Sequence, residues 1–227
     1  MQEKVVVNSH NFSIQNQIPV GANIRSEGEQ ITKGKLALRR GIKMTPAAIG
    51  YLSSLGIKEV SVFKKPVIAI VTTGNELVEA GEELEYGQIY ESNSKMLLSA
   101  LYSLNFYDVK IHKIEDDYKT THSKLKEVIR DNDLVIISGG ISVGDYDFVG
   151  KALHELNITV HYYKVKQKTG KPIFHGTKGN THILALQWNP AAAITCFFIY
   201  IVISVQKLTD IDVLDLLSIK TKSNSTF

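Results

Sequence analysis

The run from Ser138 to Gly144 (SGGISVG) contains the residue types that most directly suggest chemistry. Its glycines allow backbone N–H groups to approach an anion without obstruction by a Cβ atom, and Ser138 and Ser142 add hydroxyl groups. The pattern predicts a cradle for a phosphate or another oxyanion. The alternative is a tight strand-to-helix turn that is rich in glycine for packing reasons alone. The spacing matches neither the Walker lysine motif nor GxGxxG.

Acidic residues stand close to this run. Asp145 and Asp147 lie where a helix is expected to begin. Their carboxylates either interact favourably with the helix dipole or hold a divalent cation such as Mg²⁺ beside a bound phosphate. Asp116 and Asp117 follow another predicted strand. They either face the same site or are solvated acids of a turn.

Three further segments are candidates for the same site. Residues 72–76 (TTGNE) end a predicted strand and open toward the ligand, whereas residues 91–94 (ESNS) either line the cleft or, as we favour, cap the next helix. Lys164, Lys166 and Lys168 alternate on leaving a strand, which predicts one basic face. That face suits an oxyanion, or it protects an edge strand from aggregation.

The composition bounds the remaining possibilities. A net charge of +3 indicates a small anionic ligand more readily than a nucleic acid. The single cysteine, Cys196, lies in an apolar run and is expected in the core, which favours a reducing compartment and a cytoplasmic location without a secretory signal. The seven histidines form neither an i, i+4 pair nor HExxH, and we assign none to a metal.

The positions of these residues depend on an alternation of apolar strands and amphipathic helices. This alternation predicts an α/β fold with a mostly parallel sheet covered by helices on both faces, with the ligand at the carboxyl edge. The predicted strands are 67–73, 107–114, 133–138, 158–165 and 182–186, and the predicted helices are 94–105, 119–131, 147–156 and 190–206.

The chain divides into three predicted regions. Residues 1–64 are predicted to form part of a β-rich linker domain with one helix capped by Thr45. Residues 65–207 are predicted to form the α/β domain, and residues 208–227 a C-terminal stub. The apolar run 191–205 is shorter than the roughly 17–25 residues of a membrane helix. We therefore expect a buried helix and no membrane contact, with a short tail anchor as the alternative.

Several motifs occur in the order found in one known family. They are TGNEL at 73–77, GQIYESNS at 87–94, SGGISVGDYDF at 138–148, KxxxKTGKP at 164–172, and Asn189 with Pro190. Together they resemble the MoeA family of molybdopterin molybdenumtransferases, which includes the corresponding E-domain of gephyrin. Relative to that family the chain is truncated at both ends. Gln187 and Trp188 stand where the family usually has Pro-Gly.

The resemblance implies a MogA-like three-layer αβα sandwich that inserts molybdate into adenylylated molybdopterin with Mg²⁺ and releases AMP. It also implies a homodimer and a MogA-like adenylyltransferase partner. The implied catalytic residues are Asp116, Asp147, Lys164 and Lys168, with Asp145 and Asp147 as the Mg²⁺ ligands. The implied residues for the pterin phosphate are Thr73, Gly74, Asn75, Glu76, Ser138, Gly139, Gly140, Ser142, Gly144, Asn189 and Pro190.

Two other functions remain open at this point. The first is a catalytically silent molybdopterin-binding fragment or assembly module, which the truncation favours. The second is a CinA-like hydrolase of a nucleotide pyrophosphate, because the TGNEL and GGISVGD runs suit both groups. The segment 1–60 and the lysine loop favour the MoeA type.

Overall fold

The computed structural model describes residues 5–14, 17–141 and 148–210. The chain forms two compact units, one of residues 1–40 and 44–58 and the other of residues 41–43 and 59–227. The second unit contains every described candidate residue of the site. Each unit is described by itself below.

The first unit contains little regular structure. Two short strands, β1 (Val5–Val7) and β2 (Phe12–Ile14), pair antiparallel, which agrees with the extended character predicted for this region. Helix α1 (Pro46–Ser54) begins as predicted, because the Thr45 hydroxyl accepts a hydrogen bond of 3.2 Å from the backbone N–H of Ala48.

A six-stranded sheet forms the centre of the second unit, with the order β6-β3-β7-β10-β9-β8. Strands β3, β6, β7 and β10 are parallel, and β9 is antiparallel to both β10 and β8, so the mostly parallel sheet is confirmed. The strands are β3 (Ile68–Thr73), β6 (Val109–Ile114), β7 (Leu134–Ser138), β8 (Thr159–Tyr163), β9 (Phe174–Lys178) and β10 (Thr181–Leu186).

Strand β9 was not predicted. Gly176 lies in its middle, and glycine is unfavourable inside a strand unless another group approaches closely. Here a Cβ on Gly176 would lie 2.6 Å from Ile158 Cγ2 and 2.9 Å from the carbonyl oxygen of Thr159. The glycine therefore permits close packing that the local sequence does not reveal.

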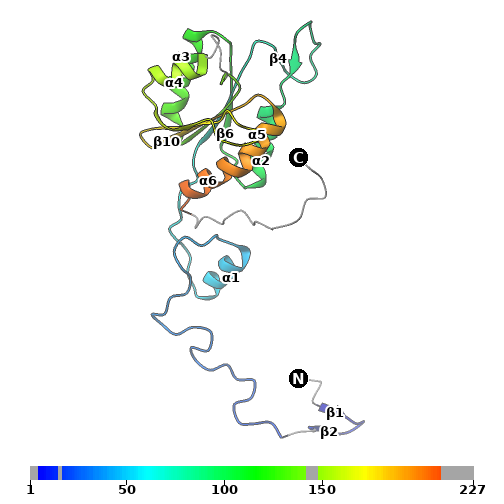
Figure 1. The fold of residues 1–227 in the computed structure, drawn as a ribbon. Coiled ribbons are helices and arrows are strands. Elements are labelled where there is room, and N and C mark those ends of the chain that lie inside the picture. The colour runs from blue at the N-terminus through cyan, green and yellow to red at the C-terminus, as the bar shows by residue number, and fades with distance from the viewer. Residues whose placement is uncertain (1–4, 15–16, 142–147, 211–227) are drawn as a thin grey trace. The chain divides into compact units, whose positions relative to one another are not determined.

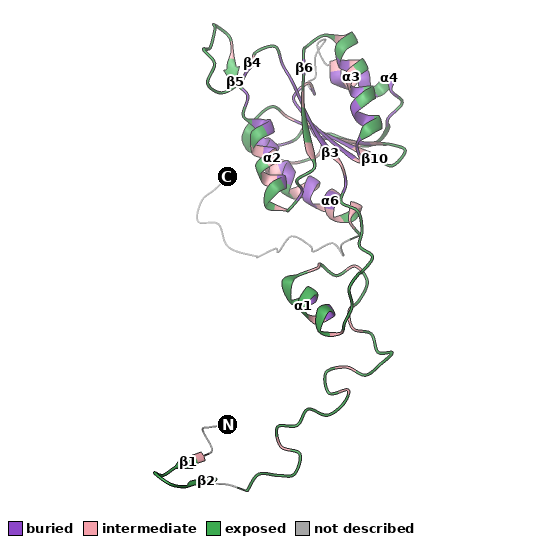
Figure 2. Ribbon diagram, turned by 180° about the vertical axis from the view of Figure 1, so that it is seen from behind, coloured by how far each residue is buried: buried purple, intermediate pink, exposed green. Residues whose placement is uncertain are grey.

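Helices cover both faces of the sheet, so the predicted three-layer αβα sandwich is confirmed (Figure 1). One face carries α3 (Tyr118–Asp131) and α4 (Phe148–Glu155). The other carries α2 (Asn93–Ser103) and the helix that follows β10. Figure 2 shows the strands buried between helices whose outer sides are exposed. All of β3 and β7 is buried, as expected for strands covered on both faces.

The helix after β10 is continuous from α5 (Pro190–Cys196) through a π-helical segment, η2 (Phe197–Ile201), to α6 (Val202–Leu208). Its length and composition would also suit a membrane span, with 39% of the apolar window buried. Its inner residues, including Phe197 and Val205, belong to the same buried cluster as strands β3 and β7. This packing is what we predicted for a core helix.

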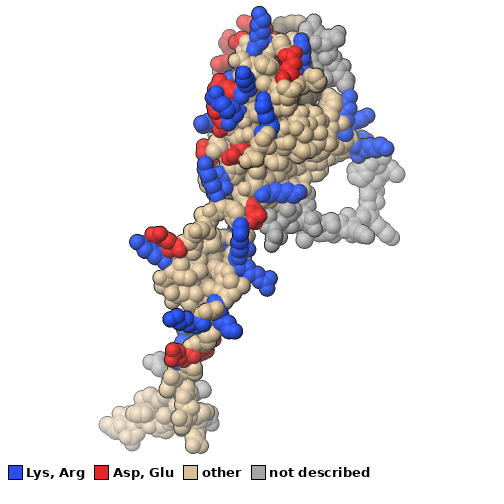
Figure 3. All heavy atoms as spheres, turned by 90° about the vertical axis from the view of Figure 1, so that its left-hand side faces the viewer, with Lys and Arg blue, Asp and Glu red and all other residues tan. Residues whose placement is uncertain are grey.

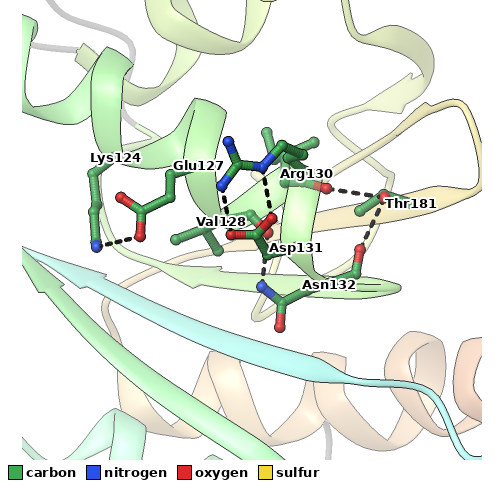
Figure 4. A network of polar contacts seen from close by, with 8 residues as sticks. Lys124, Glu127, Val128, Arg130, Asp131, Asn132 and Thr181 are labelled. Atoms are coloured by element: carbon green, nitrogen blue, oxygen red, sulfur yellow. Dashed lines mark hydrogen bonds and ion pairs between the residues drawn. The ribbon is translucent and has the colours of Figure 1, made fainter.

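The amino edge of the sheet is held by a polar network (Figure 4). The Thr181 hydroxyl lies 3.0 Å from the carbonyl oxygen of Ile129 and 2.9 Å from that of Asn132, which ties the end of α3 to β10. Arg130 and Asp131 form an exposed ion pair there, and such pairs contribute little to stability. This network stabilises the fold at the edge opposite the carboxyl ends of the parallel strands.

Candidate functional site

The strand order places a topological switch point between β3 and β7. The chain leaves β3 for β6 on one side and then returns to β7 on the other, while α2 and α3 cover opposite faces. In open α/β sheets, ligands bind outside the carboxyl ends of the strands at such a switch point. The segments 72–76 and 138–141 both emerge there, because Thr72 lies in register with Ser138.

The two glycines after β7 are required by close contacts. Gly139 has a φ of 99°, and a Cβ on it would lie 3.0 Å from the carbonyl oxygen of Thr73. Gly140 has a φ of 66°, and its Cβ would lie 2.4 Å from Val149 Cγ2 and 3.0 Å from Thr73 Oγ1. The backbone N–H of Gly139 donates to the carbonyl oxygen of Leu186 at 3.1 Å. Tight packing thus accounts for both glycines, and it also brings Thr73 and Ser138 together.

Asn93 joins three elements at this switch point. Its Nδ2 donates to Ser138 Oγ at 2.8 Å and to the carbonyl oxygen of Trp188 at 2.6 Å. The ends of β7 and β10 are therefore tied to the start of α2. Since Ser138 Oγ accepts from Asn93, its own hydroxyl proton can be donated to another group.

The segment 91–94 combines the two roles that its sequence left open. Glu91 is buried, and its Oε1 accepts from the backbone N–H of Ser94 at 2.8 Å, so its carboxylate binds a free N–H of the first turn of α2, whereas the N-cap residue Ser92 makes no side-chain cap hydrogen bond. Asn93, from the same segment, instead contacts the ends of β7 and β10. The sequence suggested that Asn93 caps a helix, but it did not reveal that Asn93 contacts Ser138 and Trp188.

The other side of β3 presents a second group of polar residues. Asn75 Oδ1 accepts from the backbone N–H of Asp116 at 3.0 Å, so the loop after β3 is tied to the end of β6. A hollow of about 340 Å³ is lined by Gly74, Asn75, Lys113 and Glu115. Lys113, which sequence reasoning missed, donates to the carbonyl oxygen of Leu77 at 2.7 Å. Lys113 pairs in register with Thr72, a position that only the strand pairing reveals.

Asp117 is distinguished from Asp116 by its local role. Its Oδ2 accepts from the backbone N–H of Thr120 at 2.8 Å and caps α3. The hydrogen bonds from Thr120 lower the pKa of the Asp117 carboxyl. Asp117 is therefore a helix cap, whereas Asp116 remains at the carboxyl edge beside Asn75.

The three lysines do not share a strand face, and this part of the prediction is wrong. β8 ends at Tyr163, and Lys164 has a φ of 68°, which is incompatible with a strand. The backbone turns back here, because the N–H of Lys164 donates to Ile173 and that of Val165 to Lys171. Lys164 and Lys168 are exposed in the connection to β9, and this connection lies at the carboxyl edge because β8 runs in the direction of β10.

The lysine loop is fastened to the helix after β10. Gly170 is buried with a φ of 93°, and a Cβ on it would lie 2.5 Å from Cys196 Sγ. The Tyr200 hydroxyl donates to Gln167 Oε1 at 2.8 Å. Burial raises the pKa of the Cys196 thiol. Cys196 is thus a packing residue, as its apolar surroundings predicted.

Asn189 and Pro190 act together as a helix start. Asn189 Oδ1 accepts from the backbone N–H groups of Ala191 and Ala192 at 3.0 and 3.3 Å, and Pro190 occupies the first helical turn, where its missing N–H is harmless. The predicted cap is confirmed. This arrangement directs the amino end of α5 toward the edge where β10 ends.

The carboxyl edge is long compared with a phosphate group. At about 4.8 Å per strand, the ends of β6 and β8 lie roughly 24 Å apart, and β7 lies between them. Asp116 and Lys164 therefore stand at opposite ends of the edge. Thr73, Ser138, Gly139 and Gly140 meet at its centre. Gly74 and Glu76 lie beside them, since a Cβ on Gly74 would be 2.8 Å from Glu76 Oε1.

The remaining predicted residues are Ser142, Gly144, Asp145 and Asp147, which lie outside the described residues. Within the described ranges, no group of three or more His, Cys, Asp or Glu side chains could hold a metal ion. On the face drawn in Figure 3, basic and acidic side chains are interspersed.

Three histidines that are distant in sequence gather on β8, β9 and β10. His175 Nε2 lies 3.2 Å from His182 Nδ1, and the ring centroids of His161 and His175 are 4.9 Å apart. Burial, together with the charges of the other two histidines, lowers the pKa of His175 to about 4. Burial also lowers the pKa of His182. This row of aromatic side chains packs against the helix that contains Tyr200, through Tyr162.

The comparisons with known proteins agree with this geometry. Residues 69–207 match the family described as "Probable molybdopterin binding domain". The chain belongs to this molybdopterin-binding family, and the relatives and the solved structure described next place it with the MoeA proteins. The matched residues include β3, β7, β10, the lysine loop and the helix that fastens it. The family assigned from the motifs is thereby confirmed.

Relatives of this MoeA-family chain are longer than the chain itself. It is 33% identical over 199 residues to the molybdopterin molybdenumtransferase of Haemophilus influenzae, covering 87% of the chain and 49% of the relative. The molybdopterin molybdenumtransferase of Bacillus subtilis is 30% identical over 84% of the chain and 44% of its own length. The chain spans about half the length of these curated relatives.

A solved structure supports the same assignment. The molybdopterin biosynthesis MoeA protein from Pyrococcus horikoshii superposes with a TM-score of 0.72 at 27% identity. The superposition covers 91% of this chain and 51% of that protein. The MoeA-like fold therefore extends over nearly all of the chain.

Proposed function

We propose that this chain contributes the molybdopterin-binding part of an enzyme of molybdenum cofactor biosynthesis. The observation that carries the proposal is that residues 69–207, which match the molybdopterin-binding family, supply the carboxyl ends of β3 and β7 that meet at the switch point. The full reaction we propose is insertion of molybdate into adenylylated molybdopterin with release of AMP. Related proteins named molybdopterin molybdenumtransferase support this choice.

In this proposal the pterin phosphate binds at the centre of the edge. The Ser138 hydroxyl, which accepts from Asn93, donates its proton to a phosphate oxygen. Lys113 on one side, and Lys164 and Lys168 on the other, attract the anionic substrate and molybdate by their charge. Cleavage of the pyrophosphate bond adds charge to the oxygen that leaves, and positioned donors stabilise that charge.

Mg²⁺ and Asp147 stay a prediction in this scheme. Mg²⁺ would neutralise charge on the pyrophosphate oxygens, as it does in other phosphoryl reactions. Asp116 stands at the same edge, fixed by the hydrogen bond between its backbone N–H and Asn75. Replacing Asp116 by Asn tests its role, because the backbone contact is kept and only the charge is lost. We expect AMP release to fall with little change in melting temperature.

The proposal is tested by separating binding from turnover. Calorimetry with molybdopterin measures binding, and AMP release from adenylylated molybdopterin with molybdate measures turnover. Lys164→Ala and Lys168→Ala should each weaken binding, while Lys126→Ala, on the outer side of α3, serves as the matched control. Absence of both binding and AMP release at high protein concentration would overturn the proposal.

A second candidate function is a binding or assembly module without turnover. The observation that favours it is that Gln187 and Trp188 stand where the family usually has Pro-Gly. Molybdopterin binding without AMP release would support this module. Hydrolysis of a nucleotide pyrophosphate without molybdate would instead support the CinA-like alternative.

The partners of the chain are also proposals. We propose a homodimer in the cytoplasm that receives its substrate from a MogA-like adenylyltransferase. Sedimentation of the purified chain tests the dimer, and co-purification with the adenylyltransferase tests the transfer. A monomer at all concentrations would contradict the first, and separate elution would contradict the second.

A further inference from the structure

Trp188, the single tryptophan of the chain, is exposed at the carboxyl edge of the sheet. Its exposed fraction is 68%, although an indole ring is among the largest apolar surfaces a side chain can bury. It follows β10 by two residues, and Leu186 at the end of β10 lies in register with Ser138. The exposed ring therefore belongs to a residue next to the glycine turn.

The backbone of Trp188 is fixed from both sides. Its carbonyl oxygen accepts from Asn93 Nδ2 at 2.6 Å, and the same amide nitrogen donates to Ser138 Oγ at 2.8 Å. The following residue, Asn189, caps α5. A ring carried on a fixed backbone has only two side-chain torsions to restrict on binding, so it loses little entropy when a ligand stacks on it.

The side-chain amide of Asn93 has an oxygen atom, Oδ1, to which no described group donates. Its Oδ1 is buried and has no hydrogen-bond partner among residues 5–14, 17–141 and 148–210. Exchanging the two amide atoms would not help, because an oxygen would then face the Trp188 carbonyl oxygen at 2.6 Å. A buried acceptor without a donor is unfavourable, and a donor introduced by a ligand would relieve it.

We propose that Trp188 stacks on the flat heteroaromatic ring of a ligand whose phosphate lies at the glycine turn. The inference rests on the proposed function and adds the residue that recognises the ring. Pterin and adenine rings share the required chemistry, since both are flat and carry N–H donors. Stacking on an aromatic side chain tolerates either ring, whereas a phosphate without a ring gains nothing from Trp188.

A single tryptophan makes the inference directly measurable. The intrinsic fluorescence of the full chain is titrated with a pterin phosphate, with AMP and with inorganic phosphate, and calorimetry measures each affinity independently. We expect quenching with the pterin phosphate, with AMP, or with both, and none with inorganic phosphate. Comparing the pterin phosphate with AMP shows whether Trp188 stacks on the pterin ring or on the adenine ring.

Variants separate stacking from folding. Trp188→Ala should weaken binding of the ring compound on the order of tenfold, whereas Trp188→Phe should retain most of the affinity. Neither variant should lower the melting temperature, because the side chain is largely exposed. Tyr107→Ala is the matched control, since Tyr107 has an exposed fraction of 61% and precedes β6 at the opposite edge. Its affinity should equal that of the parent.

The outcomes distinguish the inference from the proposed function. If the parent binds neither the pterin phosphate nor AMP, the proposed function fails and the stacking role fails with it. If the parent binds but Trp188→Ala binds equally well, only the stacking role is overturned. Equal affinity combined with a loss of self-association in Trp188→Ala would show that the indole contacts a protein instead, which also overturns the inference.

Discussion

Replacing Gly140 by alanine should destabilise the domain strongly, because two penalties coincide at this residue. Its φ of 66° is a conformation that costs an L-residue about 1–2 kcal/mol. The added Cβ would also lie 2.4 Å from Val149 Cγ2 and 3.1 Å from Val149 Cβ, so rotating the valine cannot remove both contacts. Overpacking of a core adds about 1–3 kcal/mol. We therefore expect a loss of about 2–5 kcal/mol in the free energy of unfolding.

Urea denaturation of the parent and variants measures this loss. Gly87→Ala is the matched control, because Gly87 has a φ of 86° and a Cβ there would meet nothing within 4 Å. It should lose only the conformational part, about 1–2 kcal/mol. The difference between the two variants isolates the contact between the glycine turn and Val149.

A double-mutant cycle tests the cause. Val149→Ala alone should destabilise through the cavity that it leaves in a fully packed site, since Val149 is buried. In the double variant the new methyl group should occupy part of that space, so the two losses should fall short of additivity by more than about 0.5 kcal/mol. Strict additivity, or a Gly140→Ala variant as stable as Gly87→Ala, would refute the reasoning.

Three further predictions concern the same domain. Asn93→Ala should lower the free energy of unfolding by about 2 kcal/mol, because Ser138 and a backbone carbonyl lose a buried donor, and urea denaturation checks this. Thr169→Gly should raise it by about 1 kcal/mol, since Thr169 is a β-branched residue with a φ of 60°; a less stable variant would contradict the assigned backbone. The pKa of His175 is lowered to about 4, so the folded state binds fewer protons than the unfolded state. Stability should fall as the pH drops from about 6.5 to about 4, and His175→Gln should show a smaller fall in melting temperature.

Much of the fold could be predicted from local patterns. The apolar runs of the strands and the spacing of the helices depend on burial and periodicity, which neighbouring residues determine together. The caps at Thr45 and Asn189 were predictable for the same reason, since a helix start requires a side-chain acceptor within three residues. The glycine turn after β7 could likewise be placed at the carboxyl edge, because a buried parallel strand precedes it.

Predictions that depended on continuing a local pattern were less reliable. The lysine alternation suggested one basic face from Lys164 to Lys168, but the backbone reverses at Lys164 because the chain returns as β9. β9 itself was missed, since Gly176 is unfavourable in a strand until Ile158 and Thr159 pack against it. Both errors arise from contacts between residues that are not adjacent in sequence.

The sequence by itself determined most of the element types, the glycine turn, the caps at Thr45 and Asn189 and, through the order of its motifs, the family. Only the tertiary structure decided that β3 and β7 are neighbours, that Asn93 contacts Ser138 and Trp188, and that Lys113 lines a hollow beside Gly74. The reason is physical. Capping and periodicity act over a few residues, whereas strand order and the pairing of buried polar atoms depend on which distant segments pack together.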